Sequence, residues 1–162
     1  GQGPVPLVGL DPVSAPDLPG PEHTSPGSAA AHGLPVIFHR DAVEARFTKG
    51  DWSIPGSATA WMRLSVPFIA GEETPALCEL LAVADFGSAL SQSVAPEAGV
   101  ALINVDVNVT LAGSPVGPWF CLATQGSVSD EGIGLAVTHL FDLNGPLGAI
   151  TQSQIVYGFS RS

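Results

Sequence analysis

The sequence predicts an α+β domain in which one long helix lies across an antiparallel sheet. One segment of the chain has helical periodicity, and several short runs rich in Val, Ile, Thr and aromatic residues are separated by Gly and Pro. The composition is 45% hydrophobic and only 12% charged. A chain of 162 residues can bury one sizeable core but is short for two ordinary domains. We therefore expect one folded domain.

The first 36 residues are predicted to be a tail or an interdomain linker, and residues 37–162 to form the domain. Prolines recur there among Gly, Ser and Ala, which removes backbone donors and favours extended conformations. The segment could be free, or it could be an arm docked on the domain. Apolar residues available for docking are Val5, Leu7, Val8 and Leu10. The chain begins without a Met, as expected of a processed product or a fragment.

Two strands are expected before the helix, at residues 36–47 and 58–68, because apolar residues recur along both runs. The segment between them contains Gly50, Pro55 and Gly56, which supply a turn.

The single helix is predicted from Pro75 to about Gln92. Thr74 can act as the N-cap, and Pro75 suits the first helical position. Leu77 and Leu81 are four residues apart, with Leu80, Ala84 and Ser88 beside them, so we expect this face to pack on the sheet.

Asp85 continues that face, one turn beyond Leu81. A buried carboxylate is costly unless it is hydrogen-bonded. In one interpretation the helix rotates or frays late and leaves Asp85 at a wet edge. In the other, Asp85 is a general base that activates a water molecule.

Four more strands are expected after the helix, joined in a meander, which gives a sheet of six strands. Their predicted ranges are 100–111, 119–128, 133–141 and 147–159.

Polar and apolar residues alternate along the first of these four strands. The polar stripe is Asn104, Asp106 and Asn108, and the apolar stripe is Ile103, Val105, Val107 and Val109. Half-exposed antiparallel strands commonly alternate in this way, so we expect Asp106 and Asn108 to face solvent. On the last strand Gln152 and Gln154 share a face, and a glutamine amide can donate to a carbonyl or orient a water.

Composition and missing motifs exclude several functions. Fifteen acids against five Lys and Arg give a formal charge of −10, which disfavours nucleic acid and membrane partners. The sequence has no G-x-S-x-G elbow, Walker loop or complete dinucleotide fingerprint. No secretory signal or membrane span is apparent, so we expect a cytoplasmic protein.

The four histidines, at positions 23, 32, 39 and 139, lack metal-binding spacing, so we expect no metal site. Cys78 and Cys121 belong to no C-x-x-C motif and are expected to be reduced, buried residues.

Four stretches together resemble the C-terminal half of TesB-like, double-hotdog acyl-CoA thioesterases. They are A-D-F-G-S at 84–88, I-N-V-D-V-N-V-T-L at 103–111 followed by P-W, G-I-G-L-A…L-F-D…G-P-L-G at 132–148, and T-Q-S at 151–153. The resemblance covers about residues 38–159. It implies a hotdog fold, a long helix wrapped by a six-stranded antiparallel sheet, preceded in the family by a Pro-rich linker.

The resemblance also implies a water-activating site. The family uses an aspartate on the helix, a threonine or serine two positions before an aspartate on the next strand, and a glutamine on the last strand. Asp85 and Gln152 match the first and third of these. At the second position Asn104 replaces the hydroxyl with an amide, and Val107 stands where the family commonly has a histidine.

The expected function is hydrolysis of a fatty acyl-CoA by a water that Asp85 activates, positioned by Asn104 and Gln152, without a covalent intermediate. The acyl chain would lie in an apolar tunnel beside the helix, and no metal or redox cofactor is implied. The alternative is a non-catalytic hotdog half, a structural or acyl-binding module. Because one hotdog leaves a strand edge open, the expected partner is an N-terminal hotdog domain or a second copy.

Few basic residues are available to bind the phosphates of coenzyme A. We therefore expect the phosphate-bearing part of coenzyme A to bind a partner domain or to extend into solvent. The basic residues are Arg40, Arg46, Lys49, Arg63 and Arg161.

Overall fold

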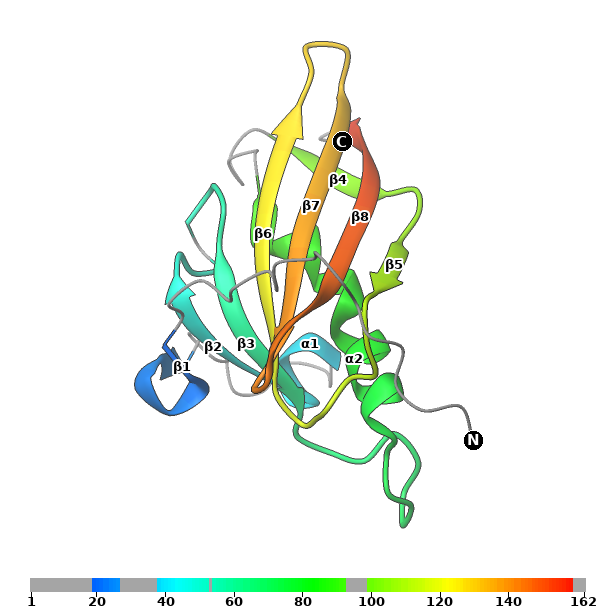
Figure 1. Ribbon diagram of the computed structural model, residues 1–162. Helices are drawn as coiled ribbons and strands as arrows, with labels where there is room; N and C mark the ends of the chain where they lie inside the picture. Colours follow the sequence, from blue (N-terminus) through cyan, green and yellow to red (C-terminus); the bar gives the residue numbers. More distant parts are fainter. Residues whose placement is uncertain (1–18, 27–37, 53, 93–98, 159–162) are drawn as a thin grey trace, which may run out of the picture.

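The computed structural model describes residues 19–26, 38–52, 54–92 and 99–158 (Figure 1). The helical elements are η1 (Pro21–His23), α1 (Phe38–Asp41), α2 (Ala76–Ala84), η2 (Asp85–Gly87) and η3 (Ala89–Ser91). The strands are β1 (Ser25–Pro26), β2 (Val43–Lys49), β3 (Thr59–Leu64), β4 (Val100–Asn104), β5 (Asn108–Leu111), β6 (Phe120–Val128), β7 (Ile133–Asp142) and β8 (Gly145–Gly158).

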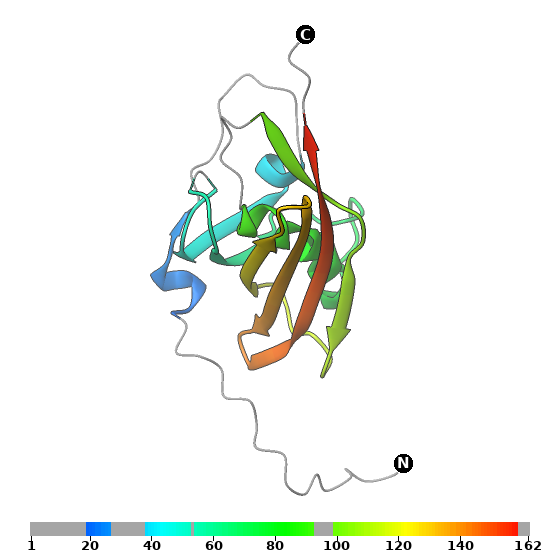
Figure 2. The same cartoon turned by 90° about the horizontal axis from the view of Figure 1, so that it is seen from above.

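The strands form one antiparallel sheet in the order β1-β2-β3-β6-β7-β8-β4, with β5 also pairing with β8. The sheet curls around α2, as Figures 1 and 2 show from two directions. This confirms the predicted α+β architecture of one helix on an antiparallel sheet. The meander holds only for β6, β7 and β8, because β4 crosses to the far side of β8. β1 adds a short strand beside β2.

The main core lies between α2 and the inner face of the sheet. Its buried residues include Leu80, Val83 and Ala84 from α2, with Ala60, Met62, Phe120, Leu122, Leu140 and Ile150 from the strands. Removing this much apolar surface from water is the main force that fixes the helix on the sheet.

The helix packs with a different face from the one predicted. Leu77 and Leu81 are 46% and 50% exposed, whereas Leu80 and Val83 are fully buried. Both sets have helical spacing, so periodicity could not distinguish them. The helix is rotated so that Leu77, Leu81 and Asp85 lie on its outward side.

The helix also begins and ends differently from the prediction. Pro75 is the N-cap, and no side chain caps α2, because the Thr74 hydroxyl accepts the Phe68 N–H at 2.8 Å instead. The α-helical stretch ends at Ala84 and continues to Ser91 as two 3₁₀ turns. Asp85, Gly87 and Ser88 have low helix propensity, which favours this change of winding.

The first two predicted strands are shorter than expected. Residues 38–41 form the single turn α1, closed by the bond from Ala42 N to the Phe38 carbonyl at 3.0 Å, so β2 begins only at Val43. β3 ends at Leu64, before Pro67, which cannot donate to a ladder.

The predicted strand at 100–111 is interrupted at residues 105–107, between β4 and β5. Asp106 bridges the interruption, because its carboxylate accepts the Ser153 N–H at 2.7 Å and the Ser153 hydroxyl at 3.1 Å. The alternation is therefore broken, and Val105 and Val107 are exposed together with Asp106 and Asn108. The exposure of Asp106 and Asn108 was predicted, but that of the two valines was not.

Residues 19–26 dock on the sheet. Trp61 Nε1 donates to the Pro19 carbonyl at 2.8 Å, and Arg46 Nη1 donates to the Pro21 carbonyl at 3.0 Å. This part of the predicted tail is therefore an arm on the domain. The apolar residues first considered for docking, Val5 to Leu10, lie outside the described residues.

Trp61 belongs to a second apolar cluster with Trp119, Cys121 and Phe141. Burial raises the pKa of the Cys121 thiol to about 12. Cys78, in contrast, is exposed on α2, so the prediction that both cysteines are buried holds only for Cys121. Within the described ranges, no helix is both long and apolar enough to cross a membrane.

Candidate active site

The structure brings together all three side chains that the sequence singled out. Asn104 Nδ2 donates to Asp85 Oδ1 at 2.7 Å, and Gln152 Nε2 donates to the same oxygen at 3.0 Å. Gln152 Nε2 also donates to the Asp85 backbone carbonyl at 3.2 Å. Two amide donors therefore meet one carboxylate oxygen, although the residues are 19 and 67 positions apart from Asp85.

Asp85 and Asn104 lie at the ends of a helix and a strand, and Gln152 lies on the inner face of the sheet. Asp85 is the first residue after α2, where the winding tightens into η2. Gln152 lies on the inner face of β8 and is fully buried. Asn104 is the last residue of β4, and its backbone is paired with Gln154. The site therefore lies where the helix end meets the β4 edge of the sheet.

Gly87 allows the helix end to approach β8 closely. A Cβ at this position would collide with Gln152 Oε1 and would lie 2.7 Å from Thr138 Oγ1. Thr138 Oγ1 is itself 2.8 Å from Thr124 Oγ1. Only glycine leaves room here for a polar inner face on β7 and β8, so Gly87 is a structural requirement of the site that the sequence analysis missed.

The amide N–H groups of Gln152 and Asn104 differ in how many of them bind Asp85. Gln152 Nε2 makes both of its bonds to Asp85, one to the side chain and one to the backbone. Asn104 Nδ2 carries two N–H groups, and one of them is used on Asp85. Gln152 therefore holds the carboxylate, and Asn104 keeps one N–H for another acceptor.

Asp85 is exposed rather than enclosed in an apolar environment. Asp85 lies at the solvent-exposed edge that one interpretation predicted, because the helix turns its Leu77 and Leu81 side outward. This exposure does not decide whether Asp85 acts as a general base. These two leucines and Asp85 follow at intervals of four residues, so an exposed apolar strip leads along α2 to the carboxylate.

A second polar layer lies beside the three predicted residues. Gln154 Nε2 donates to Ser88 Oγ at 2.8 Å and to Asn104 Oδ1 at 3.4 Å. The signal in the sequence was present for Gln154, which is two residues beyond Gln152 and so shares its face. Ser88 was placed beside the packing face of the helix and within the A-D-F-G-S motif, but it was not assigned to the site.

The basic residues of the described chain make their ion pairs away from this site. Arg46 and Arg63 both pair with Glu44, at 2.7 and 2.6 Å, and both lie over the ring of Trp119. Burial raises the pKa of Glu44, but the hydrogen bonds from the two arginines outweigh it and lower this pKa overall. Arg40 pairs with Asp41 at 2.7 Å.

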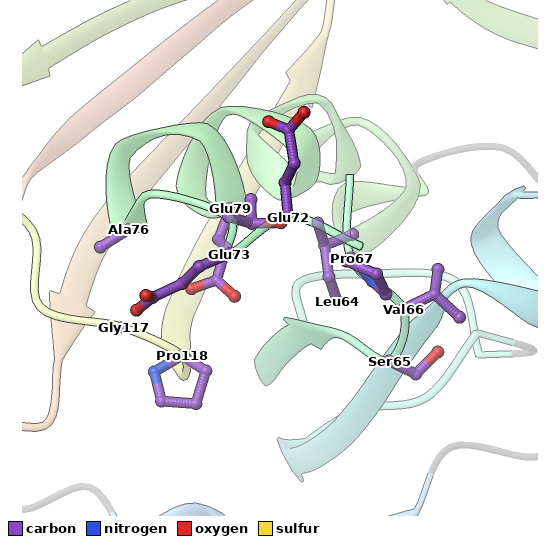
Figure 3. Close-up of a pocket in the computed structure, with 11 residues that line it drawn as sticks. Leu64, Ser65, Val66, Pro67, Glu72, Glu73, Ala76, Glu79, Gly117 and Pro118 are labelled. Atoms are coloured by element: carbon purple, nitrogen blue, oxygen red, sulfur yellow. The ribbon is translucent and has the colours of Figure 1, made fainter. Parts of the chain in front are cut away.

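A hollow of about 520 Å³ lies at the opposite end of α2 (Figure 3). Its lining is Leu64, Ser65, Val66, Pro67, Glu72, Glu73, Thr74, Ala76, Glu79, Gly117 and Pro118. In Figure 3 the side chains of Glu73 and Glu79 extend toward Gly117 and Pro118. Burial, together with the charge of Glu73, raises the pKa of Glu79. This acidic hollow does not correspond to the apolar tunnel expected beside Asp85.

Comparison with solved structures shows which fold the chain shares. An acyl-CoA thioesterase II, TesB2, from Mycobacterium marinum is 16% identical with a TM-score of 0.65, covering 100% of this chain and 61% of its own. A conserved protein of unknown function with a hot dog fold from Alicyclobacillus acidocaldarius is 16% identical with a TM-score of 0.65, covering 98% and 60%. A tesB protein from Mycobacterium avium subsp. paratuberculosis is 18% identical with a TM-score of 0.58, covering 93% and 56%.

These likenesses define the class of protein: the chain has the hotdog fold. The family described as the acyl-CoA thioesterase C-terminal domain matches residues 12–156. The chain therefore belongs to that family, which confirms the resemblance seen in the sequence. It spans about 60% of the length of these three solved structures. A comparison with curated protein sequences gives no match.

Among the described residues, no group of three or more His, Cys, Asp and Glu side chains is arranged to hold a metal ion.

Proposed function

We propose that this domain hydrolyses a fatty acyl-CoA thioester by direct attack of a water that Asp85 activates. The observation that supports it most strongly is the convergence of the Asn104 and Gln152 amides on one oxygen of the Asp85 carboxylate. A general base must be held within hydrogen-bond reach of the proton that it removes. Asp85 is held by two donors, and its exposure gives it access to water.

In the proposed reaction, Asp85 accepts a proton from the water as the water oxygen attacks the thioester carbonyl carbon. The carbonyl oxygen becomes an oxyanion, and the remaining N–H of Asn104 donates to it. The carbon–sulfur bond then breaks, and the thiolate of coenzyme A leaves and takes up the proton held by Asp85. The products are the fatty acid and free coenzyme A, with no acyl group attached to the protein.

We further propose that a partner completes the acyl tunnel, either an N-terminal hotdog domain or a second copy of this domain. The exposed strip of Leu77 and Leu81 beside Asp85 supports this, because large apolar side chains in one patch mark interaction or ligand sites. The chain also spans only about 60% of its solved relatives. Since Arg46 and Arg63 are engaged by Glu44, the partner or solvent meets the phosphates of coenzyme A.

The second candidate is a non-catalytic hotdog half that binds acyl chains or supports a partner. The observation that favours it is the amide of Asn104, which stands where the resembling family has a hydroxyl and so cannot accept and donate through one atom.

Two variants separate these candidates. Asp85→Asn and Gln152→Leu should each lower kcat for medium- or long-chain acyl-CoA by about a hundredfold or more, because a positioned base contributes that much. The matched control is Glu79→Gln, which makes the same kind of change at the other end of α2 and should leave hydrolysis within about twofold. Activity unchanged in both site variants contradicts the proposed mechanism. A wild-type protein that binds acyl chains without hydrolysing them supports the module.

Mass spectrometry of the protein during turnover tests the direct attack, since an acylated protein would contradict it. Sizing chromatography with light scattering tests the partner. We expect a dimer or a complex with an N-terminal hotdog domain, and a stable monomer at micromolar concentration would contradict self-pairing.

A further inference from the structure

Gln154 is the buried polar side chain nearest to the site that the proposed mechanism does not use. It is 1% exposed, and it lies on β8 on the same inner face as Gln152. Its amide nitrogen donates to Ser88 Oγ at 2.8 Å and to Asn104 Oδ1 at 3.4 Å. Its carbonyl oxygen is buried without a hydrogen-bond partner among the described residues. A buried amide oxygen without a hydrogen-bond partner costs free energy. We therefore ask what the two bonds of the Gln154 amide nitrogen contribute to the site.

The amide of Asn104 can lie in two orientations of nearly the same shape, with oxygen and nitrogen exchanged. Only one of them presents a donor to the Asp85 carboxylate, and the other presents an oxygen and is repelled. Gln154 donates to Asn104 Oδ1, which is compatible only with the orientation in which Nδ2 faces Asp85. A hydroxyl at position 104 would need no such selection, because it rotates to donate or accept as required.

The backbone fixes the geometry of this contact. Asn104 and Gln154 are directly paired where β4 ends, so their side chains are cross-strand neighbours. On the other side of Gln154, its paired residue on β7 is Gly134, where a Cβ would lie 3.1 Å from Gln154 Cβ and 3.2 Å from its Oε1. The missing side chain of Gly134 therefore leaves the space that Gln154 occupies, and the Ser88 hydroxyl accepts from the Gln154 amide nitrogen at 2.8 Å.

We propose that Gln154, the cross-strand neighbour of Asn104 and in contact with Ser88, is a positioning residue that selects the Asn104 amide orientation in which Nδ2 faces Asp85. This inference rests on the proposed hydrolysis, and it explains how an asparagine can serve at a position where the resembling family uses a hydroxyl. Gln154 acts through Asn104 and does not touch the reacting atoms.

The test compares Gln154→Met, which keeps the volume but removes the donor, with Thr124→Val, which removes a buried hydroxyl bond on the same inner face. In the intact protein, Gln154→Met should lower kcat for acyl-CoA about tenfold and leave KM within about twofold, because it disturbs the alignment of the site and not substrate binding. Ser88→Ala should act in the same direction and more weakly. Thr124→Val should leave kcat within about twofold.

Two further readouts distinguish positioning from general damage. The side-chain amide signals of ¹⁵N-labelled Asn104 should shift or broaden in Gln154→Met and stay in place in Thr124→Val. In an Asn104→Thr background, Gln154→Met should change kcat by less than about twofold, because no amide is left to orient. Equal losses in both backgrounds, or unchanged Asn104 signals, overturn the positioning role. If Gln154→Met does not fold, the signals in Ser88→Ala decide.

Failure of the proposed hydrolysis gives a different result. In that case the wild-type protein does not exceed Asp85→Asn in hydrolysis, while the Asn104 amide signals still report whether Gln154 orients them.

Discussion

Both ends of helix α2 carry a carboxylate, but the two carboxylates have opposite surroundings: one receives hydrogen-bond donors and the other lies beside a second acid. At the C-terminal end, Asp85 receives two amide donors on one oxygen. At the N-terminal end, Glu79 is partly buried beside Glu73, and both effects raise its pKa. The two ends are about 13 Å apart along the axis, at 1.5 Å for each residue from Ala76 to Asp85.

The difference shows that the hollow and the candidate active site lie at different places in this fold. The acidic end has a recess lined by three glutamates, but the charge of Glu73 acts against that of Glu79. No amide donors converge on these carboxylates in the bonds of the described residues. The Asp85 end is open and exposed, yet amide donors from two separate strands, β4 and β8, meet its carboxylate. Convergent donors, and not the volume of a recess, identify the candidate site here.

The largest expected loss of activity comes from adding a side chain at Gly87, where the end of the helix packs closely against Gln152. Gly87→Ala places a Cβ against Gln152 Oε1 and Thr138 Oγ1, so it should displace Gln152, lower hydrolysis about a hundredfold and destabilise the fold by about 1 to 3 kcal/mol. Steady-state kinetics and denaturant unfolding measure the two effects. Gly113→Ala is the matched control, because an added Cβ there meets nothing within 4 Å. Wild-type activity in Gly87→Ala would show that the packing at Gly87 does not position Gln152.

A smaller loss of stability is expected when Glu44, a carboxylate that receives hydrogen bonds from two arginines, is neutralised. The folded-state pKa of Glu44 is lowered below its ordinary value of 4.5, so its contribution to stability is complete above that value and is lost as the pH falls through the lowered pKa. Glu44→Gln should therefore destabilise the protein by about 1 kcal/mol at pH 7. The difference from wild type should disappear in strong acid. Urea unfolding across this pH range tests it, with the exposed Glu131→Gln as a neutral control.

The smallest effect has the opposite sign. The folded-state pKa of Glu79 is raised above 4.5, so the contribution of Glu79 to stability is most favourable below that value and is lost as the pH rises through the raised pKa. Glu79→Gln should stabilise the protein by less than about 1 kcal/mol at pH 7, because the helix N-terminus itself favours an acid and limits the gain. Thermal unfolding at pH 7 and pH 4 measures it. A loss of stability at pH 7 would mean that Glu79 is favourably solvated.

Much of this site could be predicted from the sequence. Asp85 and Gln152 were identified through short motifs, and Asn104 through its place before Val105-Asp106. The sheet was predicted from β-branched runs and turn residues, which are local signals. The family assignment was correct because those motifs extend over most of the chain. Whether these residues act in catalysis stays a prediction.

Other features depend on contacts that no local pattern specifies. The helix has two apolar stripes, so only the tertiary packing of Leu80 and Val83 decides that Leu77 and Leu81 face outward. The interruption after Asn104 was hidden by a regular alternation of polar and apolar residues. Ser88 joins the site where the helix tightens into 3₁₀ turns after Ala84, and Gly87 in the same segment packs closely against Gln152 of β8.

The carboxylate of Asp106 has a consequence for how this rim can vary. By accepting two bonds from Ser153, it fastens the excursion at residues 105–107 to the middle of β8, between the two glutamines. An added or deleted residue in this loop would change only the solvent-exposed part, as long as the two hydrogen bonds between Asp106 and Ser153 are kept. Variation in loop length could therefore reshape the rim beside Asn104 while the inner side chains of β8 stay in register.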